Sequence, residues 1–133
     1  MSAAQSRPLV VTTMVSGALV ILLEAWDAFH IEQPMGAIIA IVAVAAGIIW
    51  LRRRGGRGPA IYLGVLFALE VIGNFTIFGV LDDLRHRGTW MDFATGVGYT
   101  VATIAGLIAC LMLAAPSSRP RTGPAPAEIT ADR

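Results

Sequence analysis

The sequence predicts an all-α fold: a polytopic integral membrane protein built as a four-transmembrane-helix bundle. Four long apolar runs fill most of the 133 residues, and 56% of the residues are hydrophobic while only 14% are charged. Charged residues make up about 25% of an ordinary soluble domain. A helix rises about 1.5 Å per residue and the hydrocarbon core is about 30 Å thick, so each run is long enough to cross a bilayer. The predicted helices cover about residues 8–29, 35–51, 59–81 and 93–115.

The first helix follows a short polar tail, residues 1–7. Its apolar run is longer than the roughly 7–15 residues of the apolar h-region of a signal peptide, and it ends in Glu24-Ala25-Trp26-Asp27 rather than in small residues. We therefore expect it to be a mature helix.

The second and third helices are joined by a basic, glycine-rich segment. A short acidic link, His30–Pro34, precedes the second helix, and proline suits a first helical turn. The second helix is expected to end at Leu51, so that Arg52–Gly58 forms a loop and Pro59 opens the third helix.

The fourth helix follows a polar loop, residues 82–90. Thr89 and Asp92 have the spacing of a capping box, which predicts a helix start nearby. Pro116 ends the helix, and the rest of the tail, 116–133, is rich in Pro, Ala, Thr and Arg, which predicts disorder.

The arginines predict the orientation. The loop between the second and third helices carries Arg52, Arg53, Arg54 and Arg57, and the first loop has no arginine. Short basic loops stay in the cytoplasm, so we expect the inner membrane with both termini cytoplasmic. The arginine run is interpreted as this topology signal, in contact with lipid headgroups, and not as a nucleic-acid site.

Each helix shows a stripe at alternating three- and four-residue steps, which predicts its packing face. The stripes place the intramembrane carboxylates between helices rather than toward lipid. The four stripes are Thr13, Gly17, Val20, Glu24 and Asp27; Gly36, Ala40, Ala43, Gly47 and Trp50; Leu63, Phe67, Glu70, Asn74 and Ile77; and Gly96, Tyr99, Thr103, Gly106, Cys110 and Leu113.

Glu70 is the most informative polar residue, because it lies about 16 Å into the third helix, near the bilayer midplane. A charge there costs roughly 2.5–3.5 kcal/mol, so the carboxyl is expected to be neutral or paired. Asn74 lies one turn away on the same face. Two interpretations stay open: a proton- or cation-binding carboxylate, or interhelical hydrogen bonding by a neutral Glu and Asn.

A second acidic cluster, Glu24, Asp27, His30 and Glu32, lies at the outer end of the first helix. Carboxylates and imidazole can bind a divalent metal, which makes Asp27, His30 and Glu32 metal candidates, but a solvated helix end is the interpretation that we favour. By depth, Tyr99, Thr100 and Thr103 are expected in a similar layer of the outer half to Glu24 and Asn74, with Glu70 below them. These residues either line one polar pocket or are scattered around the bundle.

The segment IYLGVLFALEVIGN, Ile61–Asn74, resembles the first helix of small multidrug resistance transporters. In that family a tyrosine-leucine-glycine start precedes a membrane-embedded glutamate. The resemblance implies that Glu70 is the coupling residue, which binds protons and cationic drugs in competition within a dimer. It covers about one tenth of the chain and lies in the third helix rather than the first.

These observations predict a small proton- or cation-coupled transporter that uses Glu70, with Glu24 and Asp27 as an outer entry. The alternative is a non-catalytic accessory or assembly subunit of a larger membrane complex. No P-loop, dinucleotide fingerprint, zinc spacing or nucleophile elbow occurs, so we expect neither an enzyme nor a cofactor. The expected partners are the bilayer, further copies or a larger complex, and protons or a small cation, with no nucleic acid.

Overall fold

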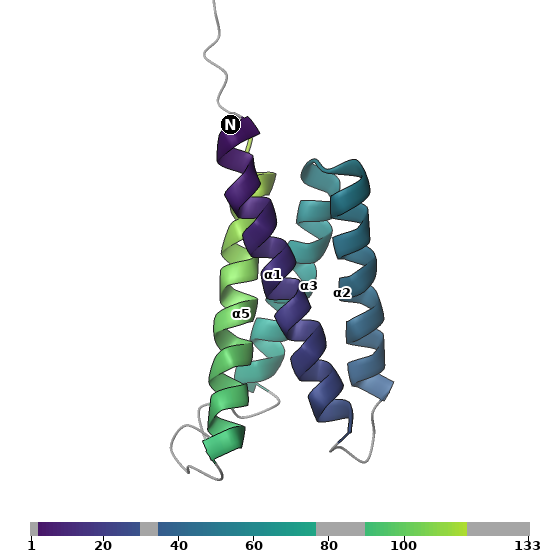
Figure 1. The fold of residues 1–133 in the computed structure, drawn as a ribbon, viewed down its shortest axis with the longest axis vertical. Helices are drawn as coiled ribbons and strands as arrows, with labels where there is room; N and C mark the ends of the chain where they lie inside the picture. The colour runs from purple at the N-terminus through teal and green to yellow at the C-terminus, as the bar shows by residue number, and fades with distance from the viewer. Residues whose placement is uncertain (1–2, 30–34, 77–89, 117–133) are drawn as a thin grey trace, which may run out of the picture.

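The chain is all-helical in the part that the structure describes. The computed structural model describes residues 3–29, 35–76 and 90–116. They form four helices, each containing a segment long and apolar enough to cross a membrane: α1 (Ala3–Ala28), α2 (Met35–Arg54), α3 (Arg57–Thr76) and α5 (Trp90–Ala114). The predicted fold class is therefore confirmed at the level of four long apolar helices (Figure 1).

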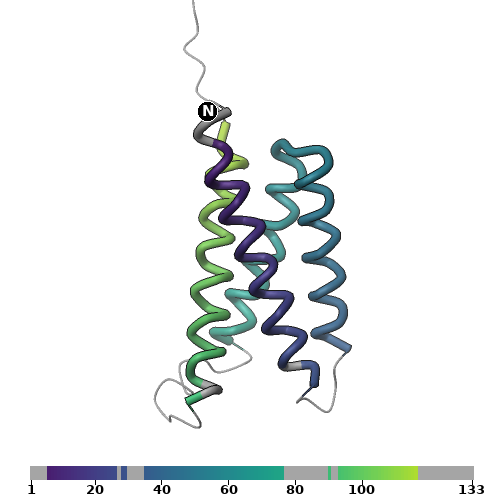
Figure 2. The backbone as a smooth tube through the Cα atoms, viewed as in Figure 1, coloured from purple at the N-terminus to yellow at the C-terminus, as the bar shows by residue number. Residues whose placement is uncertain are grey.

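The helices form a four-membered ring. α1 packs against α2 and α5, and α3 packs against the same two helices, whereas the diagonal pairs α1–α3 and α2–α5 make no close backbone contact within the described residues. In Figures 1 and 2, α1 runs obliquely across the bundle in front of α3. The start of α1, the α2–α3 turn and the end of α5 share one end of the bundle, which we call the arginine end because Arg7, Arg52–Arg54 and Arg57 belong to it.

The helix boundaries differ from the predicted ones at the arginine end. α1 begins at Ala3, five residues before the predicted start. Pro8 is the sixth residue of α1, so it removes one helical hydrogen bond to the residue-4 carbonyl and weakens the turn before it without ending the helix. α2 continues to Arg54, so the expected loop Arg52–Gly58 was wrong. Its arginines lie in the last helical turn, where positive charge interacts favourably with the helix dipole.

Only Gly55 and Gly56 separate α2 from α3. Both have positive φ, 57° and 86°, a conformation that residues with a Cβ rarely adopt. The Gly55 amide donates to the Leu51 carbonyl at 2.9 Å and closes the end of α2. Pro59 then lies in the first turn of α3, where a missing amide costs no helical bond.

The predicted end of the third helix and the predicted ends of the fourth helix lie only partly within the described residues. α3 is described to Thr76, so the predicted continuation to residue 81 lies outside the described residues. α5 begins at Trp90, three residues before the predicted start, and ends at Ala114. The expected capping box at Thr89 and the tail beyond Pro116 are also outside the described part.

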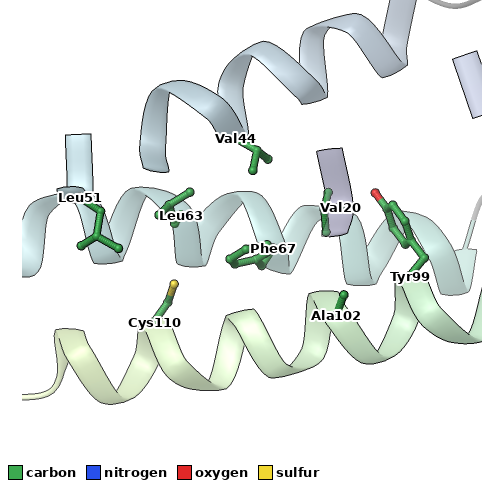
Figure 3. Close-up of a cluster of buried hydrophobic side chains, with 8 residues drawn as sticks. All are labelled: Val20, Val44, Leu51, Leu63, Phe67, Tyr99, Ala102 and Cys110. Atoms are coloured by element: carbon green, nitrogen blue, oxygen red, sulfur yellow. The ribbon is translucent and has the colours of Figure 1, made fainter. Parts of the chain in front are cut away.

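The core follows three of the four predicted stripes. In α1, α3 and α5 the buried side chains fall on the expected faces. In α2 the prediction was wrong at both ends, because Gly36 and Trp50 are exposed and the buried residues are Val44, Gly47 and Leu51. Trp50 instead lies outside the core beside Tyr62, with ring centroids 6.0 Å apart. The buried hydrophobic cluster in Figure 3 consists of Val20, Val44, Leu51, Leu63, Phe67, Tyr99, Ala102 and Cys110.

Glycines set how closely the helices approach. A Cβ added at Gly106 of α5 would lie 2.7 Å from the Phe67 ring of α3. A Cβ at Gly47 of α2 would lie 2.5 Å from the Leu63 side chain. Small residues at such crossings allow close packing of apolar helices, so these glycines define the spacing of the ring.

Candidate functional site

Three polar side chains from three helices meet inside the bundle. The Tyr99 hydroxyl of α5 lies 2.5 Å from Oε1 of Glu24 in α1 and 2.7 Å from Oε2 of Glu70 in α3. Both distances fall in the range of about 2.5–2.7 Å typical of charge-assisted O–H···O hydrogen bonds. We call these residues the Glu24–Tyr99–Glu70 cluster.

The helix stripes explain how the cluster forms. Glu24 follows Val20 on the inner face of α1, and Glu70 follows Phe67 on the inner face of α3. Because α1 and α3 are diagonal in the ring, a side chain from a helix that contacts both is needed to link the two carboxyls. Tyr99, only 8% exposed, projects from α5 into the buried cluster in Figure 3 and supplies that link.

The hydrogen-bond pattern fixes a minimum number of protons. A phenol has one hydrogen, so Tyr99 donates to one carboxyl only. An ionised carboxylate is acceptor-only, so the other contact is a hydrogen bond only when that carboxyl is protonated and donates to the Tyr99 oxygen. The cluster with both bonds made therefore holds two protons, one on Tyr99 and one on a glutamate.

The charges of the described residues are segregated along the bundle. The arginine end contains Arg57 at the start of α3, about 20 Å by helix rise from Glu70. The Arg57 Nε donates to the Ala114 carbonyl at 2.8 Å and so joins α3 to the end of α5. Among the described residues, no ion pair involves Glu70, whose hydrogen-bond partner is Tyr99.

Asn74 contributes a second unusual feature on the same face of α3. It is only 7% exposed, and its Nδ2 has no hydrogen-bond partner within the described structure. Residues four apart on a helix are neighbours, so Asn74 lies next to Glu70. A buried amide without a partner costs roughly 1–3 kcal/mol, which makes Asn74 a candidate for contact with a bound molecule.

The predicted residue Thr103 does not join the cluster. It is fully buried, and its hydroxyl bonds to the carbonyls of Tyr99 and Thr100 in its own helix, each at 3.0 Å. Thr100 likewise donates to the Gly96 carbonyl at 2.9 Å. Both hydroxyls are thus used inside α5, and Thr103 supports the turn that carries Tyr99.

The side chains of the outer metal candidates lie outside the described residues. His30 and Glu32 lie outside the described residues, and the side chain of Asp27 does too, although its backbone belongs to α1. Within the described part of the chain, no group of three or more His, Cys, Asp or Glu residues is arranged to hold a metal ion.

The structure adds a second polar contact that sequence reasoning did not pair. The Thr13 hydroxyl and the Cys110 sulfur lie 3.8 Å apart between α1 and α5, and both residues are buried. Cys110 was expected as a small packing residue, and it does pack in the core. Its partner could not be identified from spacing, because the two residues are 97 positions apart.

Comparisons of the chain with protein-family models, with curated proteins and with solved structures each found no match. The chemistry of the Glu24–Tyr99–Glu70 cluster and of Asn74 is therefore the basis for a functional proposal.

Proposed function

We propose that this protein spans the inner membrane four times, with both termini in the cytoplasm, and transports a small cation in exchange for protons. The observation that carries the proposal is the Tyr99 hydroxyl held between two carboxyls from different helices. The cluster holds an exchangeable proton in a segment apolar enough to cross a bilayer. Ionisable groups inside membrane helices are expensive, and by default they indicate proton or ion pathways.

The cluster can exchange a proton for a cation by simple charge balance. With two protons it carries one negative charge, shared through Tyr99. Loss of the glutamate proton leaves two carboxylates facing one hydroxyl, and a like-charge pair of this kind is unfavourable in a low-dielectric interior. A cation at the same oxygens restores the balance, so that proton and cation bind in competition. The resemblance of Ile61–Asn74 to small multidrug resistance transporters supports the same role for Glu70.

Asn74 supports a ligand site rather than a purely structural cluster. Structural hydrogen bonding would pair its buried amide with a neighbouring helix, whereas Nδ2 has no partner among the described residues. Buried polar groups in proteins are nearly always hydrogen-bonded, either to the protein or to a bound molecule. Its place beside Glu70 puts a free donor next to the exchangeable proton.

The second candidate is an accessory or assembly subunit of a larger membrane complex. One observation favours it: the Glu24–Tyr99–Glu70 cluster is completed within one chain and joins α1, α3 and α5. Interhelical hydrogen bonds of this kind contribute about 0.6–2 kcal/mol each to membrane-protein stability. In this role the cluster would hold the subunit together without exchanging protons.

Glu70→Gln separates the two candidates. Glutamine both donates and accepts, so it keeps a hydrogen bond to Tyr99 but cannot release a proton. We expect near-normal thermal stability in detergent, with loss of proton release when tetraphenylphosphonium or Na⁺ is added to weakly buffered protein and loss of cation-driven proton flux in liposomes. Tyr62→Phe, which removes a hydroxyl bonded to the Ala43 carbonyl of α2, is the control. Full release and flux by Glu70→Gln would overturn the transport proposal and favour the accessory subunit.

A further inference from the structure

We propose that the outer face of α2 at the arginine end is a binding site for one anionic phospholipid, whose phosphate is held by Arg53 and Arg54. This inference rests on the membrane insertion in the proposed function and is independent of transport. It starts from a hollow of about 460 Å³ lined by Ala46, Ile49, Trp50, Arg53 and Arg54.

The five lining residues belong to one helical face. They are spaced by three, one, three and one residues, so they form two adjacent ridges along α2. The face that α2 buries against its neighbours carries Val44, Gly47 and Leu51 instead. The hollow is therefore lined by α2 alone and borders α3 at one residue, where Trp50 lies beside Tyr62, and α2 lies at the edge of the bundle in Figure 1.

The two guanidinium groups in the hollow are not used by the fold. Arg53 and Arg54 are exposed, and neither makes a hydrogen bond or ion pair in the described structure. Arg57 differs, because its Nε donates to the Ala114 carbonyl. Guanidinium groups bind phosphate through paired N–H···O bonds, and two adjacent free ones match one phosphate group.

The rest of the hollow argues for a lipid rather than for free phosphate. Ala46 and Ile49 continue it away from the arginines with an apolar surface, on which an acyl chain can lie. Trp50, 41% exposed, provides an aromatic ring between the two regions, as expected at the level of lipid headgroups. A zwitterionic headgroup adds a positive charge beside two arginines, so an anionic headgroup fits better.

The test uses delipidated full-length protein in a neutral detergent, so membrane orientation does not affect it. Binding of phosphatidylglycerol is measured by native mass spectrometry and by the rise in thermal midpoint, against phosphatidylcholine and against inorganic phosphate. We expect phosphatidylglycerol to be retained with one dominant stoichiometry. Arg53→Gln and Arg54→Gln should each weaken its binding about fivefold or more, as expected for loss of one basic group at an anionic lipid.

Arg52→Gln is the matched control, because it removes the same charge one residue away from the hollow. It should change binding less than twofold. An equal loss in all three variants would show diffuse charge attraction and overturn the site, and so would equal retention of phosphatidylcholine. Competition by inorganic phosphate at the same concentration as the lipid would overturn the lipid assignment. Ala46→Phe places a ring in the apolar part of the hollow with every arginine in place, and it should also weaken binding if that part holds a chain.

Discussion

The hydroxyl oxygen of Tyr99 lies 2.7 Å from Oε2 of Glu70, although the two residues belong to different helices and are 29 positions apart. The same oxygen reaches Glu24 on the diagonal helix α1. One phenol thus connects three of the four described helices, because it contacts the carboxyl groups of both Glu24 and Glu70.

Tyr99→Phe should remove both links from α5 to the carboxyls. We expect a loss of about 1–3 kcal/mol in the free energy of unfolding, because each interhelical bond contributes roughly 0.6–2 kcal/mol. Unfolding in mixed detergent measures it. Tyr62→Phe removes a single 3.2 Å bond to the Ala43 carbonyl and should cost less. Equal costs for the two variants would contradict the bridging role of Tyr99.

The proton count predicts a spectroscopic signature. One carboxyl of the Glu24–Tyr99–Glu70 cluster must carry a proton for both Tyr99 contacts to be hydrogen bonds. Infrared difference spectra between wild type and Glu70→Gln, and between wild type and Glu24→Gln, should show a carboxylic acid C=O band assigned to this pair at neutral pH. Spectra with carboxylate bands alone at neutral pH would rule out the shared proton.

Asn74→Leu tests whether the buried Asn74 amide serves ligand binding or is a structural group with a partner in the protein. Replacing a buried, unpartnered amide with an apolar side chain of similar size should raise the free energy of unfolding by about 1 kcal/mol, because the desolvation penalty disappears. We expect this gain to come with reduced cation-driven proton release. A large loss of stability would instead indicate that Asn74 has a structural partner.

Gly106→Ala tests the packing of α3 on α5. The added Cβ would lie 2.7 Å from the buried Phe67 ring, which cannot move without disturbing the core, so we expect a loss of about 1–3 kcal/mol in stability. Gly98→Ala is the matched control in the same helix, since nothing lies within 4 Å of its added Cβ. That change should be neutral or slightly stabilising through helix propensity. Comparable losses at both positions would show that the helices approach differently.

Cysteine labelling checks the orientation. In a Cys110→Ala background, an impermeant reagent added to whole cells should reach Gly88→Cys and miss Gly58→Cys, because the arginine-rich α2–α3 turn is expected in the cytoplasm. Lysed cells, in which both positions should react, are the control. The reverse pattern in intact cells would place both termini outside.

Much of the bundle was predictable because polar residues mark the inner faces of three helices. Thr13 and Glu24 in α1, Glu70 and Asn74 in α3, and Tyr99 in α5 cannot face lipid without cost, so their stripes were correctly oriented. α2 has no polar residue between Met35 and Trp50. The faces of α2 are almost equally apolar, so hydropathy does not show which face is buried. The predicted packing face was therefore wrong at Gly36 and Trp50, which are exposed.

The sequence predicts the depth of each site residue along its helix, but it does not predict which of these side chains are in contact. Glu24 and Tyr99 were expected in one layer with Glu70 below them, and the structure brings all three together. Which of the polar residues meet depends on helix rotation and tilt, which hydropathy does not determine. Thr103 illustrates this, because it lies one turn from Tyr99 and yet its hydroxyl donates to backbone carbonyls of its own helix.

The Gly55–Gly56 turn has a consequence for how the protein reaches the bilayer. Only two residues, both with positive φ, join α2 to α3, and the two helices pack side by side as a tight hairpin. In the membrane arrangement that we propose, biogenesis must deliver the two as one hairpin, with its basic tip retained on the side of synthesis. An insertion at this turn would uncouple the two helices, and the first defect would be misassembly during translation rather than loss of the finished site.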